Sequence, residues 1–551
     1  MSVRRGEGGR RGDPRDWVGH AVGALTREAP LLAGIAVGVG YAWHNGRAFV
    51  FDGRFAGYRW PDYIFNAWMI DREYPAMYNA FRYPLHGAAV AALGEWMGSY
   101  ADAATLVSSL AVVAMCIGAG LGARALATPW AGGLAAATVT TCVPVADAAR
   151  WSNLYPQLAG ASALAVGLAA VLARWPSVPV ALAAGVTACL AWATDARGLP
   201  IAMFVIPFAA LGALRAGASS RARAALILLA FALPLVAAPR LAVGWGVDTR
   251  RQLNTTSYLD VQRGVVHHWT QHSNDDAMAA ACRAVPPARM LRLDTLRTPC
   301  AARMLAHNLR ATLPRQVPFA HIGALWLLVL FLPDRRGVSG VVDRALYMVG
   351  VLGLALGASA FMPLPERYVL QFAAPLAVLV PVAWGRLAGL GGFVGQAALF
   401  VWGVQHAAAV APTRAFPPVG TRGEASYEAW NLAGEVARAR IPEGASYLDC
   451  SLHNTNLALL PRDTWPYDPV GNWGVTMTPD LHDACAAWIA DPAAGRWVAV
   501  GLAPPGQPRV DPEPRVADLL ARVRADPRWA FEARAGEAAL FRWSGAAPAP
   551  P

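Results

Sequence analysis

Two aspartates and an asparagine lie close together in an aromatic-rich segment, where carboxylates could take part in acid–base chemistry. Asp52 lies in the stretch FDGRF, and Asp62 follows Pro61 in WPDYIFNAWM. Proline suits the first turn of a helix, and the helix dipole favours the ionised form of an acid placed there. Helical spacing of four puts Asn66 on the same face as Asp62. The competing interpretation of Asp62 is a helix-start acid without a chemical role.

Three acid–arginine pairs stand at the ends of apolar stretches. They are Asp147 with Arg150, Asp195 with Arg197, and Glu366 with Arg367. A guanidinium group can bind a phosphate through two parallel hydrogen bonds, so each pair is a candidate for binding an anionic substrate. The alternatives stay open: a surface ion pair at the first position, and an interfacial anchor for the headgroups at the last.

Apolar stretches long enough to span a bilayer must position these residues. The chain has 551 residues, of which 55% are hydrophobic and only 15% are charged, whereas soluble proteins carry about 25% charged residues. We expect an all-α polytopic membrane protein with about eleven transmembrane helices, followed by a small C-terminal α/β domain. The expected spans are 29–45, 102–123, 129–147, 155–173, 177–194, 198–214, 223–243, 318–333, 342–362, 368–385 and 391–411.

Arginines predict the orientation of these spans. They alternate along the chain, so that each loop on one side carries arginine, as the positive-inside rule requires of cytoplasmic loops. We expect a cytoplasmic arginine-rich tail over 1–28 without a cleaved signal peptide, and a transmembrane domain over 29–411. Segments 46–101 and 244–317 are outside loops, and 412–545 is a periplasmic α/β domain ending in a Pro/Ala tail, 546–551. The expected location is a bacterial inner membrane.

Within the predicted C-terminal domain, we expect helices over 427–440 and 516–524. Strands are expected over 446–450, 497–502, 530–534 and 538–543. In the loop 46–101, helices along the membrane surface are expected over 61–73 and 86–96.

Cysteines agree with this orientation. Cys116, Cys142 and Cys189 fall in spans, whereas four others fall in segments placed outside, where disulfides form. Sharing a segment favours pairing Cys282 with Cys300 and Cys450 with Cys485, although free thiols are the alternative. The histidines of the stretch HHWTQH lack enough nearby acids or cysteines for a convincing zinc site.

Several motifs together resemble the GT-C superfamily of membrane glycosyltransferases, which includes protein O-mannosyltransferases and aminoarabinose transferases. They are WPDYIFNAWM followed by FRYPLHGAAVAAL, ARWSNLYPQLAGASALAVGLAAVLAR, TDARGLP and ERYVLQFAAPLAVL. The resemblance covers about residues 29–411. One departure is that Asp52 and Asp62 are each followed by a non-acidic residue, where many members carry an acidic pair.

The resemblance implies an inverting transferase that moves a sugar from a polyprenyl-phosphate donor to an acceptor hydroxyl. Asp62 would be the base and Asp52 the alternative. The remaining implied substrate contacts are Asn66, Tyr83, Asp147, Arg150, Asp195, Arg197, Glu366 and Arg367. We expect Asp52, Asp62, Asp147 and Arg367 to meet at one outward-facing cavity, with a divalent metal ion as an optional cofactor. A transporter or lipid flippase, or a non-catalytic scaffold of the same fold, are the alternatives; nucleic acid is not an expected partner.

Overall fold

The computed structural model describes the elements that can position a site. It describes residues 14–50, 85–98, 100–142, 153–243, 299–312, 337–361, 366–388, 391–415, 440–442, 445–450, 479–490, 496–501, 514–535 and 538–545, together with isolated residues between them. Three predicted elements lie outside these residues apart from one residue each: the helix at 61–73 except for Ala67, the span at 318–333 except for Phe331, and the helix at 427–440 except for Arg440.

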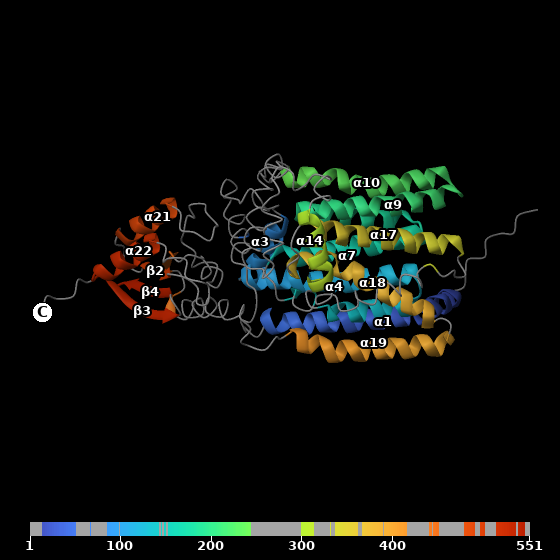
Figure 1. Ribbon diagram of the computed structural model, residues 1–551, viewed down its shortest axis with the longest axis horizontal. Helices are drawn as coiled ribbons and strands as arrows, with labels where there is room; N and C mark the ends of the chain where they lie inside the picture. The colour runs from blue at the N-terminus through green and yellow to red at the C-terminus, as the bar shows by residue number, and fades with distance from the viewer. Residues whose placement is uncertain are drawn as a thin grey trace, which may run out of the picture.

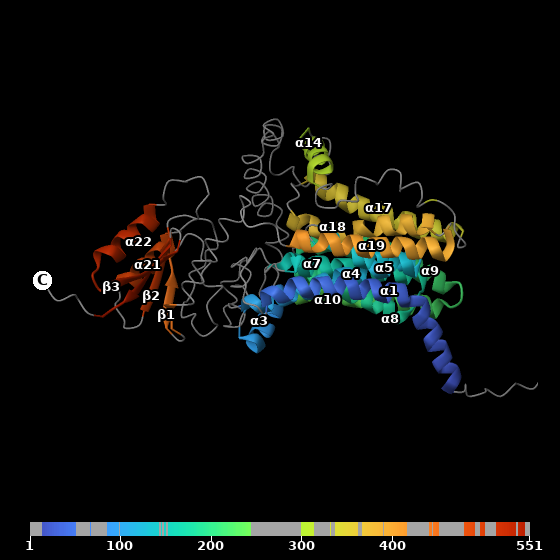
Figure 2. The same cartoon turned by 90° about the horizontal axis from the view of Figure 1, so that it is seen from below.

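Long apolar helices form a bundle, which Figures 1 and 2 show from two sides. Its members are α1 (Pro14–Val50), α4 (Tyr100–Leu126), α5 (Pro129–Thr138), α7 (Leu154–Arg174), α8 (Val178–Thr194), α9 (Leu199–Gly217), α10 (Arg221–Val243), α17 (Val338–Phe361), α18 (Glu366–Ala388) and α19 (Gly392–Ala415). Among the described residues, six helices contain a stretch that is long and apolar enough to cross a membrane: α4, α7, α9, α10, α17 and α18. The chain is therefore a membrane protein, and the expected total of about eleven spans stays a prediction.

Small residues let the central helices approach closely. A Cβ atom on Gly167 would lie 2.2 Å from the carbonyl oxygen of Gly118, so α7 and α4 touch through their backbones. Gly160 makes a similar approach to Ala111. Because hydrocarbon chains surround such helices, close packing of small residues supplies much of their association.

The predicted span at 129–147 is interrupted in the structure. Helix α5 ends at Thr138 and a short 3-10 turn, η2 (Val139–Thr141), follows. Thr138 donates its hydroxyl to the carbonyl oxygen of Leu134, and Thr140 donates to that of Ala137. Threonine side chains that bond to helix carbonyls compete with the regular ladder, which accounts for a helix ending inside an apolar stretch.

Two arginines of the loops predicted to be cytoplasmic, Arg124 and Arg215, lie at the same end of the bundle, beside the end of α7. Arg124, in the last turn of α4, donates to the carboxylate of Glu28 through Nε and a terminal nitrogen. Arg215, in the last turn of α9, donates to the carbonyl oxygen of Ala173 at the end of α7. Arg124 thus neutralises a carboxylate of α1, whereas Arg215 satisfies a carbonyl at the end of α7, where cations are favoured.

At the opposite end, helix α3 (Leu85–Met97) leads into α4, and the C-terminal strands lie beyond it (Figure 1). Strands β1 (Ser446–Asp449), β2 (Arg496–Gly501), β3 (Trp529–Ala535) and β4 (Ala538–Trp543) form one sheet in the order β1-β2-β4-β3. The pair β1–β2 is parallel and the other pairs are antiparallel. Helices α21 (Pro479–Ala490) and α22 (Pro514–Ala525) supply core residues beside those of the sheet. The sequence predicted these strands and α22 to within about two residues, and missed α21.

Cys450 and Cys485 form the disulfide predicted for the C-terminal region. Their Cα atoms lie 6.0 Å apart, and the bond joins the end of β1 to α21. Cys116, Cys142 and Cys189 are buried and form no disulfide, as expected for cysteines within the bundle. Cys282 lies outside the described residues, and Cys300 is described only as part of α14 (Pro299–His307), so that pairing stays a prediction.

Candidate functional site

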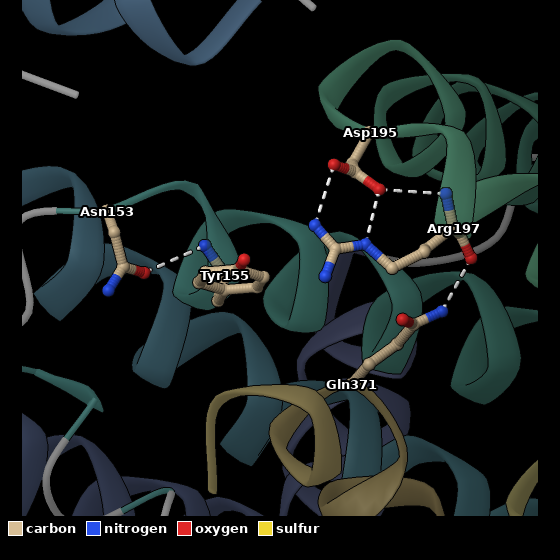
Figure 3. Close-up of polar contacts among 5 residues, drawn as sticks. All are labelled: Asn153, Tyr155, Asp195, Arg197 and Gln371. Carbon is tan, nitrogen blue, oxygen red and sulfur yellow. Dashed lines mark hydrogen bonds and ion pairs between the residues drawn. The ribbon is translucent and has the colours of Figure 1, made fainter. Parts of the chain in front are cut away.

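A polar cluster lies at the end of the bundle opposite Arg124 and Arg215. Its centre is the turn between α8 and α9, where the side chains of Asp195 and Arg197 face each other (Figure 3). The Nε atom of Arg197 donates to Oδ1 of Asp195 at 2.6 Å, and the NH2 group donates to Oδ2 at 2.8 Å. This two-point geometry fixes the plane of the guanidinium group as well as its position.

Local sequence explains why the turn forms. Asp195 has an extended backbone that ends α8, and its Oδ1 accepts a hydrogen bond from the backbone N–H of Arg197 at 2.9 Å. Aspartate commonly closes such turns by bonding two residues ahead. Gly198 then approaches α8 so closely that a Cβ atom would lie 2.1 Å from the carbonyl oxygen of Ala191. The motif TDARGLP therefore encodes a tight turn that holds an arginine in place.

Two other helices hold Arg197 from further directions. Its Cζ atom lies 4.6 Å from the centroid of the Tyr155 ring, in the first turn of α7. From α18, the side chain of Gln371 donates to the backbone carbonyl oxygen of Arg197 at 2.7 Å. Asp195 and Tyr155 therefore orient the guanidinium group of Arg197, and Gln371 fixes its backbone.

Charge in the cluster is balanced and mostly shielded. The side chains of Arg197 and Asp195 are 22% and 13% exposed, so solvent screens their attraction only in part. An aromatic face adds attraction for the cation. A partly exposed guanidinium group of this kind can bind an anionic oxygen while the carboxylate keeps it in place.

Asn153 and His86 extend the polar region towards α3. Asn153 precedes α7 and caps it, because its Oδ1 accepts a hydrogen bond from the backbone N–H of Tyr155 at 3.0 Å. His86, in the first turn of α3, donates through Nδ1 to Oε1 of Gln157 at 2.9 Å, since that oxygen can only accept. The first turns of α3 and α7 are therefore joined.

Of the candidate residues from the sequence, the structure brings Asp195 and Arg197 together. Glu366 and Arg367 form the start of α18, one turn before Gln371, but their side chains lie outside the described part of the chain. The same holds for all atoms of Asp52, Asp62, Asn66, Tyr83, Asp147 and Arg150. Convergence of Asp52, Asp62, Asp147 and Arg367 on one cavity therefore stays a prediction.

Sequence reasoning missed Asn153, Tyr155 and Gln371 as members of the cluster. All three lie in motifs that carried the family resemblance, WSNLYPQ and ERYVLQF. Their neutral side chains gave no charge signal, and their approach to Arg197 depends on how the helices pack. The one available signal was the presence of polar residues at the first turn of an apolar span.

A metal site has no support from the described residues. None of them belong to a group of three or more His, Cys, Asp or Glu side chains that could hold a metal ion. The histidines of HHWTQH lie outside the described ranges. The optional divalent metal ion stays a prediction.

No protein-family model and no curated protein sequence matches the chain. Its structure is similar to that of ArnT from Cupriavidus metallidurans bound to undecaprenyl phosphate, with 14% identity, a TM-score of 0.50, and coverage of 96% of this chain and 98% of ArnT. The apo form of ArnT gives a TM-score of 0.49 at 13% identity, covering 96% and 98% of the two chains. AglB, an archaeal oligosaccharyltransferase from Archaeoglobus fulgidus, gives 0.44 at 13% identity over 75% of this chain and 58% of its own. The fold of ArnT extends over nearly the whole chain, so the two proteins share a fold, in agreement with the resemblance carried by the motifs.

Proposed function

We propose that the chain is an inverting glycosyltransferase that moves a sugar from a polyprenyl-phosphate donor to an acceptor hydroxyl at the outer face of a bacterial inner membrane. The N-terminus would lie in the cytoplasm and the C-terminal sheet in the periplasm. The observation that carries the proposal is the guanidinium group of Arg197 at one end of a GT-C bundle, oriented by Asp195 and Tyr155, with its backbone fixed by Gln371.

A donor of this class needs positive charge where its phosphate leaves. In the reaction, the acceptor oxygen attacks the anomeric carbon while the bond from that carbon to the phosphate oxygen breaks. Arg197 supplies one cation at this end of the bundle, and Arg150 and Arg367 are further candidates. ArnT, which has this fold, binds undecaprenyl phosphate, which supports a lipid phosphate as the donor's leaving group. Phosphate is stable as an anion, so no general acid is required.

The acceptor hydroxyl must lose its proton as it attacks. In the proposed mechanism Asp62 takes that proton, with Asp52 as the alternative base. Asp147 and Glu366 would contact the donor sugar or orient a cation, and Asn66 and Tyr83 would line the acceptor side. Inversion follows because a single displacement has no covalent enzyme intermediate.

The test compares the two candidate bases in purified, full-length protein in lipid nanodiscs. A panel of undecaprenyl-phosphate-linked sugars is supplied with a membrane glycolipid extract as acceptor, and release of undecaprenyl phosphate is measured. Asp62→Asn should lower the rate by about 100-fold or more, the usual range for losing a general base. Glu95→Gln, which changes an exposed carboxylate on α3, is the control and should leave the rate unchanged.

Each outcome separates one alternative. Loss of activity in Asp52→Asn with full activity in Asp62→Asn would make Asp52 the base. Full activity in both variants would remove this loop from the mechanism. A wild-type protein that releases no undecaprenyl phosphate from any sugar donor would refute the transferase proposal.

A further inference from the structure

Only one of the two polar atoms of the Asn153 side-chain amide forms a hydrogen bond in the described structure. Its Oδ1 caps α7, but its Nδ2 is buried and has no hydrogen-bond partner in the described structure. The residue as a whole is 1% exposed. A buried donor without an acceptor lowers stability, so such a group calls for a specific explanation.

Helix capping alone does not explain an asparagine at this position. A cap needs an acceptor oxygen, which serine, threonine or aspartate would supply without adding a buried N–H₂ group. The chain does this elsewhere: Thr128 caps α5 through Oγ1, which accepts a hydrogen bond from the backbone N–H of Ala131 at 3.2 Å. The amide nitrogen of Asn153 is therefore the part of the side chain that lacks a structural role.

The position of this nitrogen indicates its chemistry. It lies at the N-terminus of α7, a helix of 21 residues, where unpaired N–H groups and the helix dipole favour an anionic oxygen. Tyr155, whose backbone the same amide caps, is the residue that contacts Arg197. Figure 3 shows the Asn153 nitrogen on the side of its amide facing away from Tyr155. It is thus near the Arg197 cluster but directed to a different point.

We propose that Nδ2 of Asn153 donates a hydrogen bond to a phosphoryl oxygen of the lipid donor at the N-terminus of α7. This inference rests on the proposed function and assigns a neutral binding residue beside the charged ones. Because protein covers the nitrogen, the phosphate reaches it only when neighbouring groups move aside. Binding of the donor is therefore coupled to a local rearrangement at the start of α7.

Asn153→Asp separates the two roles of the side chain. Aspartate keeps the capping oxygen and replaces the donor with an acceptor that repels phosphate. Asn153→Ser is a second variant that keeps a capping oxygen without adding charge. Thr128→Ala removes a helix cap at the other end of the bundle and controls for the general effect of losing a cap.

The measurement is binding of undecaprenyl phosphate to full-length protein by native mass spectrometry, with undecaprenol as the phosphate-free control. Asn153→Asp and Asn153→Ser should weaken binding of undecaprenyl phosphate by about 10- to 100-fold, the loss expected for one hydrogen bond to a charged group. Thr128→Ala removes no contact with the ligand, so binding of undecaprenyl phosphate should stay within about twofold of wild type, which is well under the ~1.4 kcal/mol of a tenfold change.

Three results would overturn the assignment. Folded Asn153 variants that bind undecaprenyl phosphate like wild type would leave the residue a helix cap only. Displacement of undecaprenyl phosphate by an equal concentration of phosphatidylglycerol would assign the position to bulk phospholipid. A wild-type protein that binds undecaprenyl phosphate no better than undecaprenol would instead refute the proposed function on which the inference rests.

Discussion

The ion pair between Asp195 and Arg197 should make a large contribution to stability, which a double-mutant cycle can measure. Replacing Asp195 with asparagine or Arg197 with glutamine removes one charge and leaves the other only partly exposed. Three hydrogen bonds join the two residues, two of them between charged groups. Removing one member of such a pair should lower the free energy of unfolding by about 2–4 kcal/mol.

The double variant Asp195→Asn/Arg197→Gln leaves no unpaired charge, so its loss should be smaller than the sum of the single losses by about 2 kcal/mol. The assay is denaturant-induced unfolding in detergent, followed by tryptophan fluorescence. The matched control is the same cycle on Glu532 and Arg542, where the arginine side chain is 50% exposed and the coupling should stay below about 1 kcal/mol. Additive single losses at Asp195 and Arg197 would show that the two side chains act independently and would refute a preoriented guanidinium group.

Three further changes test the packing and the C-terminal region. Gly133→Ala places a Cβ atom 2.0 Å from the carbonyl oxygen of Pro30 and should lower the free energy of unfolding by about 1–3 kcal/mol. A Cβ atom at Gly40 meets nothing within 4 Å, so Gly40→Ala should not lower it, and thermal unfolding compares the two variants. Cys450→Ala removes the disulfide, which joins residues 35 positions apart, and should lower the free energy of chemical unfolding by about 3–4 kcal/mol. An unchanged denaturation midpoint would contradict this. A hydrogen bond from His482 lowers the pKa of the Asp518 carboxyl below its ordinary value. The contribution of Asp518 to stability is therefore present above the unfolded pKa and is lost as pH falls through the lower folded value. Asp518→Asn should flatten this loss of stability at acid pH in a series of melting temperatures.

Local patterns determined most of the secondary structure. The predicted ends of α4, α7, α8, α9, α10, α17, α18 and α19 agree with the structure to within about four residues, because a bilayer requires a long apolar run and charged residues mark where it stops. Alternating residues likewise predicted the four strands. The pairing of Cys450 with Cys485 was predicted from their shared segment and is confirmed.

Helix α5 shows where hydropathy misleads. Its apolar run predicted one span over 129–147, but hydroxyl groups of Thr138 and Thr140 bond to preceding carbonyls and a 3-10 turn replaces the helix. Average hydropathy does not register these individual hydrogen bonds. The sequence contained the threonines, but the effect depended on rotamers that only the packed structure reveals.

The sequence by itself determined that Asp195 and Arg197 would meet, since they lie two positions apart in a turn closed by Gly198. Only the tertiary structure decided that Tyr155 would contact the guanidinium group of Arg197 and that Gln371 would bond to its backbone, because these contacts join helices far apart along the chain. Hydrophobic periodicity says which residues avoid water but not how each helix is rotated against its neighbours in a lipid-facing bundle. That rotation is set by close contacts between small residues, and it brings the neutral side chains of Tyr155 and Gln371 to Arg197.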